Sequence, residues 1–147
     1  QVIRNRNGSI IGKVEKFFDL EKRKVLCVIN GKTREFDYHD NMIDKQNIAI
    51  ALMNYPFGEK AVVTYRLLTH EPNEYEIYVK ARGKELVNEV ECYKLEIVFN
   101  LGAFNIFEMF IPRFYVWYEV KAPHLFVKYE GLESGMGTPY VVVERTN

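Results

Sequence analysis

The sequence carries no excess charge and no long apolar run, and each absence excludes a class of protein. Twenty basic residues balance twenty acidic ones, which argues against nucleic acid as the main partner, because a phosphate-binding surface normally shows a basic excess. No apolar run approaches the roughly 20 residues that a membrane-spanning helix needs. We therefore expect no transmembrane segment, while a peripheral membrane contact remains open.

Sequence signatures of catalysis and of cofactor binding are also missing. The chain has no nucleophile elbow, no phosphate-binding glycine loop and no dinucleotide fingerprint. Near His39, Asp40 fits a helix N-cap and Asp44 fits the positive end of a helix dipole better than either fits a metal site. His70 and Glu71 have no second positioned group for acid–base catalysis. We expect no metal and no cofactor, and we favour a protein that is not an enzyme.

Cysteine is scarce, with Cys27 and Cys92 alone and in no metal-binding spacing. Both fall on predicted strands. We expect them to be buried free thiols, because a free cysteine behaves as a small apolar side chain and is usually buried. One disulfide is the alternative if the two strands are neighbours.

The chain length of 147 residues fits one ordinary domain. We expect this domain to span residues 1–147, with a frayed lead-in over residues 1–8. A start at Gln1 without a leader fits a processed protein.

Alternating apolar residues predict strands over most of the sequence. Asn30-Gly31 lies between two apolar runs and predicts a tight hairpin. Residues 74–82 alternate most regularly, with Ile77 and its apolar companions on one side and charged residues on the other. We interpret residues 82–84 as a tight turn. A change of apolar parity along residues 85–99 predicts a bulge near Cys92 and a bent sheet.

One segment has helical spacing instead. Residues 41–54 place apolar side chains at helical intervals, Asp40 is the expected N-cap, and Pro56 with Gly58 ends the helix. The expected fold is mainly β, a curved antiparallel meander sheet forming a half-barrel or open barrel. Its single α-helix packs on the concave side, with Ile48 and Leu52 among the contacts.

The densest aromatic stretch is residues 110–131. It predicts a strand over 113–120, a turn through Pro123, and a returning strand over 124–130. The first of these strands is apolar on both faces and must be covered twice. One cover is the sheet core, and the other is a helix, a partner or a ligand.

The second cover suggests a site. Residues 101–111 are too apolar for a free loop, and residues 104–110 would act as a movable lip over it. The candidate ligand-binding residues are all aromatic: Phe104, Phe107, Phe110, Tyr115, Trp117 and Phe126. The alternative is that these rings form an ordinary core, as most aromatic side chains do.

Several segments together resemble the DUF3108 family of uncharacterised bacterial exported proteins. They are Tyr55-Pro56-Phe57-Gly58, residues 82–87, residues 91–95, and Trp117 followed by Pro123 and residues 127–130. The resemblance covers about the last two thirds of the chain. It implies a cell-envelope or periplasmic protein with a strongly curved sheet, akin to half-barrels that cradle acyl chains. It brings no established activity and no catalytic residues.

Three classes of function follow, in order. The first is non-catalytic binding of a hydrophobic small molecule or lipid-like ligand. The second is a structural or assembly domain with an apolar protein–protein surface, which leaves a homodimer open. The third is an enzyme of unrecognised type.

Overall fold

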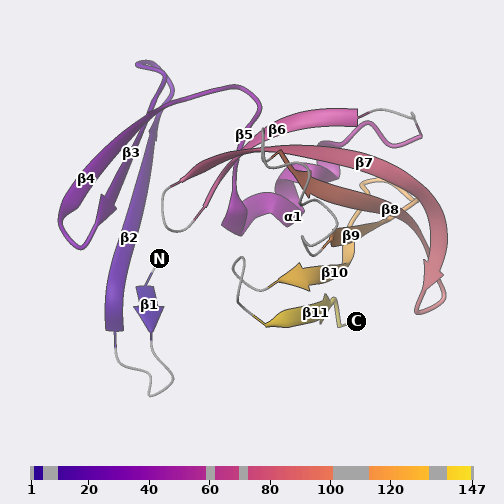
Figure 1. Ribbon diagram of the computed structural model, residues 1–147. Coiled ribbons are helices and arrows are strands. Elements are labelled where there is room, and N and C mark those ends of the chain that lie inside the picture. The colour runs from indigo at the N-terminus through magenta and orange to yellow at the C-terminus, as the bar shows by residue number, and fades with distance from the viewer. Residues whose placement is uncertain are drawn as a thin grey trace.

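The computed structural model folds the chain into two β-sheets and describes residues 2–4, 10–58, 62–69, 73–100, 113–132 and 139–146 (Figure 1). The smaller sheet has four strands in sequence order: β1 (Val2–Arg4), β2 (Ile10–Asp19), β3 (Lys24–Ile29) and β4 (Lys32–Asp37). The larger has seven, ordered β11-β10-β9-β8-β7-β6-β5: β5 (Met42–Asp44), β6 (Val62–Leu68), β7 (Glu74–Val87), β8 (Val90–Phe99), β9 (Phe114–Glu119), β10 (Phe126–Leu132) and β11 (Tyr140–Glu144).

The larger sheet curls into a half-barrel with a short helical segment on its concave side, so the expected fold class is confirmed (Figure 1). Neighbouring strands are antiparallel except β5 and β6, which pair in parallel. Part of the expected frayed lead-in is ordered, because β1 pairs with β2 and Val2 lies opposite Lys13. No helix in the described ranges is long and apolar enough to cross a membrane.

The bend of the sheet has a different origin from the one expected. The interpretation of residues 82–84 as a turn is wrong, since β7 continues through them and its register shifts between Ala81 and Gly83, where Gly83 has φ +118°. This β-bulge bends the strand. The turn comes later, at Asn88 and Glu89, which both have positive φ. The predicted bulge near Cys92 is also wrong, because β8 pairs through Cys92 without a shift.

The helical segment begins later than the apolar spacing predicts. It consists of η1 (Lys45–Asn47), α1 (Ile48–Ala51) and η2 (Leu52–Asn54). Asp40 does not cap it. The N-cap is Asp44, whose side chain accepts a hydrogen bond from the backbone N–H of Gln46. The helical segment begins only here because residues 42–44 form β5.

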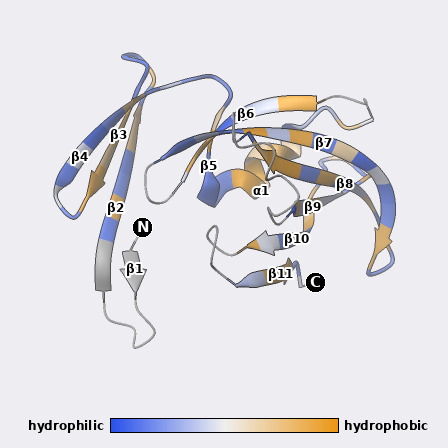
Figure 2. Ribbon diagram, viewed as in Figure 1, coloured by the Kyte–Doolittle hydropathy of each residue, from blue (hydrophilic) through white to orange (hydrophobic). Residues whose placement is uncertain are grey.

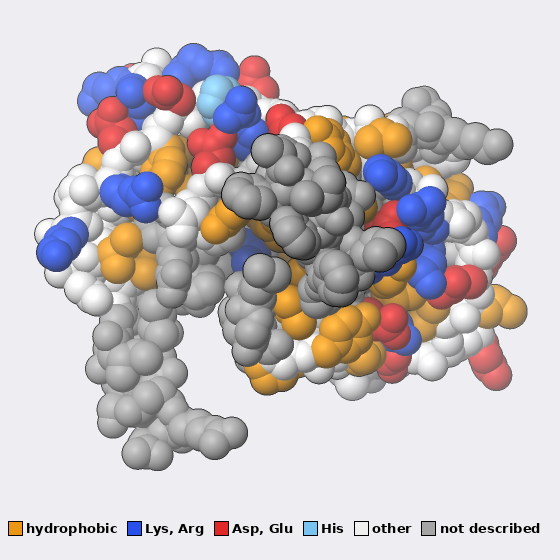
Figure 3. Space-filling model, viewed as in Figure 1, with side chains coloured by type: hydrophobic (Ala, Val, Ile, Leu, Met, Phe, Trp, Pro, Cys, Tyr) orange, Lys and Arg blue, Asp and Glu red, His pale blue; other side chains and the backbone are white. Residues whose placement is uncertain are grey.

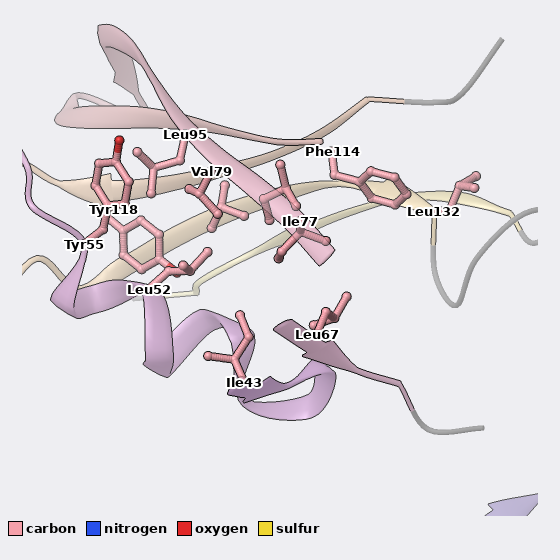
Figure 4. Close-up of a cluster of buried hydrophobic side chains, with 12 residues drawn as sticks. Ile43, Leu52, Tyr55, Leu67, Ile77, Val79, Leu95, Phe114, Tyr118 and Leu132 are labelled. Carbon is pink, nitrogen blue, oxygen red and sulfur yellow. The ribbon is translucent and has the colours of Figure 1, made fainter. Parts of the chain in front are cut away.

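The main core fills the space between the half-barrel and the helical segment (Figure 4). The predicted contacts are confirmed, since Leu52 is fully buried and Ile48 packs against the same cluster. The buried members of this core come from β5 to β10 and from the helical segment with the residue that follows it: Ile43, Leu52, Tyr55, Leu67, Ile77, Val79, Leu95, Ile97, Phe114, Val116, Tyr118 and Leu132.

The smaller sheet is joined to the larger one by a second apolar cluster and a buried ion pair. Val25 and Cys27 of β3 pack against Met42 of β5 and Leu68 of β6. Lys16 of β2 reaches Asp44 at the start of the helical segment, with Nζ 2.5 Å from Oδ2 and both side chains under 10% exposed: 8% and 9%. The expected hairpin at Asn30-Gly31 is confirmed, with positive φ at both residues.

Candidate functional site

One end of the concave face is closed by the helical segment. The hydroxyl of Tyr118 donates to the carbonyl of Ala49 over 2.8 Å, and the N–H of Ala81 donates to the hydroxyl of Tyr55 over 3.2 Å. Phe57, just after the segment, stacks on Tyr93 with ring centroids 4.9 Å apart. This end of the half-barrel is therefore filled by the chain itself.

The opposite end carries aromatic side chains from four adjacent strands, which we call the aromatic row: Tyr75 of β7, Phe99 of β8, Phe114 of β9 and Tyr129 of β10. The centroids of Tyr75 and Phe99 lie 5.9 Å apart, and those of Phe99 and Phe114 lie 5.4 Å apart. Tyr75 is 39% exposed, whereas Phe114 is nearly buried. Figure 4 shows Phe114 well away from Leu52 and Tyr55. The row is thus the part of the concave face that the helix leaves partly open.

Gly131 allows the row to pack closely. A Cβ at this position would lie 2.6 Å from Cδ1 of Phe114 and 2.6 Å from the hydroxyl of Tyr129, closer than atoms pack in a protein interior. The Tyr129 hydroxyl donates to the carbonyl of Leu132 over 2.8 Å. Burial raises the pKa of Tyr129 to about 12, so this ring stays neutral near pH 7.

The opposite, convex face of β9 is covered in a way the sequence does not reveal. Trp117 is 2% exposed and packs with Val87, Cys92 and Val127. The ammonium groups of Lys94 and Lys128 lie 4.8 Å and 5.2 Å from its ring centroid. Lysine side chains lay their alkyl stems along apolar surface and keep the charge in water. These two therefore supply the second cover in place of a helix, partner or ligand.

A hydrogen bond fixes the orientation of the Trp117 ring, because its Nε1–H donates to Glu85 over 2.6 Å. Glu85 reaches this face because the bulge in β7 exchanges the two faces of the strand beyond residue 83. Glu96, 1% exposed and also on the convex side of the sheet, is paired with Arg82 and Arg113. These charges all have structural partners.

The described members of the predicted site do not converge on one place. Tyr115 and Trp117 belong to the convex cluster. Phe126 packs against the main core on the concave side, with its ring centroid 6.2 Å from that of Tyr118. Phe104, Phe107 and Phe110 lie outside the described residues.

The prediction missed all four members of the aromatic row: Tyr75, Phe99, Phe114 and Tyr129. The alternation of apolar residues along β7 and β8 places Tyr75 and Phe99 on the core side of their strands. That signal was present in the sequence. It does not show that their rings meet, since that depends on the register between strands.

Among the described residues, nucleophilic or metal-binding groups do not gather at the row. Cys27 and Cys92 are both buried, as expected, and both are free thiols in separate clusters. Desolvation raises the pKa of each thiol, which makes a thiolate nucleophile less accessible. Within the described ranges, no three His, Cys, Asp or Glu side chains are grouped so as to hold a metal ion.

The fold and this site define a β half-barrel with a partly open apolar surface inside it. Comparison of the chain with family models, with curated proteins and with solved structures gives no match.

Proposed function

We propose that this protein is a non-catalytic binding module that takes a hydrophobic or lipid-like ligand on the aromatic row. The observation that carries the proposal is the contrast between the two ends of the concave face. Tyr118 and Tyr55 close one end with hydrogen bonds to and from backbone groups, and the other end presents Tyr75 at 39% exposure beside the ring of Phe99. Partly exposed adjacent aromatics are typical of surfaces that bind apolar partners.

The row supports modest affinity without a charged anchor. An acyl chain of about twelve carbons, half buried against the rings, gains about 5 kcal/mol at about 0.8 kcal/mol per methylene group. That gain corresponds to a dissociation constant of about 0.2 mM. Residues 101–112 connect the two strands that carry Phe99 and Phe114, so Phe104, Phe107 and Phe110 remain proposed contributors to the same site.

The proposal is tested by titrating the protein with a fluorescent fatty-acid probe. Tyr75→Glu replaces one ring of the row by a charge at a partly exposed position, and we expect probe binding to weaken about tenfold, or about 1.4 kcal/mol. Phe17→Glu is the matched control, because Phe17 is 55% exposed on β2 of the smaller sheet. Equal loss in both variants, or no binding by the wild-type chain, would refute the proposal.

A double variant, Phe107→Ser with Phe110→Ser, tests the neighbouring segment. If the segment acts as a lip, the probe should bind more weakly while the melting temperature stays nearly unchanged. Unfolding of the double variant would instead assign the two rings to the core.

For location we propose the cell envelope, on the basis of the sequence resemblance to the DUF3108 family. Fractionation of cells that express the full-length protein tests this point. Recovery in the cytoplasmic fraction alone would contradict it.

A further inference from the structure

The last strand of the larger sheet is an apolar edge. β11 pairs with β10 along its whole length and with no other described strand. Three of its side chains are about half exposed: Tyr140 at 52%, Val142 at 54% and Val143 at 50%. Figure 3 shows hydrophobic side chains at the lower edge of the larger sheet, where Figure 1 places β11. An exposed apolar edge is a template for a further strand.

The backbone of β11 offers hydrogen bonds on that open side. The N–H of Arg145 donates to the carbonyl of Val127 over 2.9 Å, so Arg145 is directed toward β10. Successive residues of an antiparallel strand alternate in the direction of their N–H and C=O groups. Tyr140, Val142 and Glu144 therefore direct theirs away from β10, toward the open edge.

Two of the other edge strands, β4 and β5, are protected in ways that β11 is not. β4 is a charged edge that includes Lys32, Arg34 and Glu35, and it is mostly hydrophilic in Figure 2. β5 is only three residues long, and beyond it the side chain of Asn41 donates to the carbonyl of Thr64 on β6. Charged and very short edges oppose strand addition.

We propose that β11 pairs with β11 of a second copy of this chain, antiparallel and across a twofold axis at Val142. In this register the two Val142 residues face each other, Val141 faces the partner's Val143, and Tyr140 faces the partner's Glu144. Every β-branched residue opposes another, and no like charges are opposed, as stable cross-strand pairs require. A twofold axis makes the two strands antiparallel without any change in their conformation.

The pairing joins the two half-barrels into one continuous sheet. The shared strand is five residues long, so the contact is small, and a weak dimer with a dissociation constant of about 100 μM is expected. The proposal is independent of ligand binding, because Val142 shares a sheet face with Glu130 and not with Tyr129.

Sedimentation velocity over a range of concentrations tests the association. Val142→Pro removes a backbone N–H that is directed away from β10 and that would bond to the second copy, and Pro is tolerated on edge strands. Val142→Thr keeps both that N–H and the β-branched shape. We expect the wild-type and Thr variants to dimerise with similar constants and the Pro variant to stay monomeric.

Disulfide cross-linking tests the register. Two Val142→Cys residues on the axis would form a hydrogen-bonded pair with Cα atoms about 5.5 Å apart, within the range for a disulfide. Val143→Cys lies off the axis, and Leu86→Cys, at a position 74% exposed near the β7–β8 turn, is the exposure control. The native cysteines are fully buried and should not interfere.

Four results would overturn the proposal. The first is a wild-type chain that remains monomeric up to about 1 mM, ten times the expected dissociation constant. The second is dimerisation of Val142→Pro as strong as that of the wild type. The third is cross-linking of Leu86→Cys as fast as that of Val142→Cys. Preferential cross-linking of Val143→Cys would also overturn it, since that outcome moves the axis.

Discussion

Replacing Asp44 by Asn should destabilise the protein far more than any exposed charge substitution. The Asp44 carboxylate accepts a hydrogen bond at the start of η1 and pairs with Lys16 across the junction of the two sheets. Asn keeps the cap, because its side-chain oxygen accepts the same hydrogen bond. What it removes is the counter-charge of a lysine side chain that is 8% exposed.

A buried charge that loses its partner costs about 3–5 kcal/mol. With a urea m-value of about 2 kcal/mol/M, the unfolding midpoint should fall by about 2 M. Lys16→Met combined with Asp44→Asn removes both charges and keeps similar volumes. We expect the double variant to recover most of the stability, since neutral replacement of a buried pair is often close to neutral.

Urea unfolding followed by circular dichroism measures the single and the double variant, and Asp37→Asn serves as the control. Asp37 also pairs with a lysine, Lys24, but it is exposed, so its midpoint should hardly change. If the free energy of unfolding of Asp44→Asn lies within about 0.5 kcal/mol of the wild-type value, Lys16 is hydrated at the junction. That result would refute a stabilising role for the buried pair.

Three further outcomes are expected. Burial raises the pKa of Tyr129 from 10.0 to about 12, so the stabilisation it brings is complete below about pH 10 and is lost as the pH rises through about 12. In the Tyr129→Phe variant, the midpoint of urea unfolding should therefore fall less between pH 10 and pH 12 than it does in the wild type. Lys94→Ala should increase acrylamide quenching of Trp117 and Lys94→Met should not, because only the first removes the alkyl cover; equal quenching would contradict this. Cys27 and Cys92 should react with a thiol reagent only after unfolding, and rapid labelling of the native protein would refute their burial.

The strand pattern and the position of the helical segment were accessible from the sequence because they depend on local signals. Alternation marks β7, with Ile77 and Val79 fully buried, and Asn30-Gly31 marks the β3–β4 hairpin. Pro123 falls in the turn between β9 and β10 as expected. Each of these features requires only residues that are close in the chain.

The misplaced bulge shows where local signals fail. Cys92 and Leu95 are both buried although they face opposite sides of β8, and two buried faces in one strand mimic a change of parity. The true change lies across the hairpin, at Gly83 of β7. Asp44 displaces Asp40 as the cap for a similar reason, since pairing of β5 with β6 delays the first helical turn.

The candidate site was less predictable than the fold because the side chains that cover a residue on a sheet face come from other strands. In the sequence Lys94 and Lys128 are read as solvent-exposed charges, whereas in the structure they cover the ring of Trp117. The aromatic row likewise needs the register that sets Phe114 opposite Ile97 and brings its ring beside Phe99. Sequence spacing identifies the rings but not their neighbours.

The small size of α1 has a dynamic consequence. A helix of four residues has no stability of its own, so the segment from Lys45 to Asn54 stays folded only while contacts such as that of the Tyr118 hydroxyl with Ala49 hold it against the sheet. Opening this segment breaks few backbone hydrogen bonds and leaves the long β7–β8 pairing intact. Its amides should therefore exchange with solvent well before those of the sheet, and each such opening briefly bares the inner surface around Leu52.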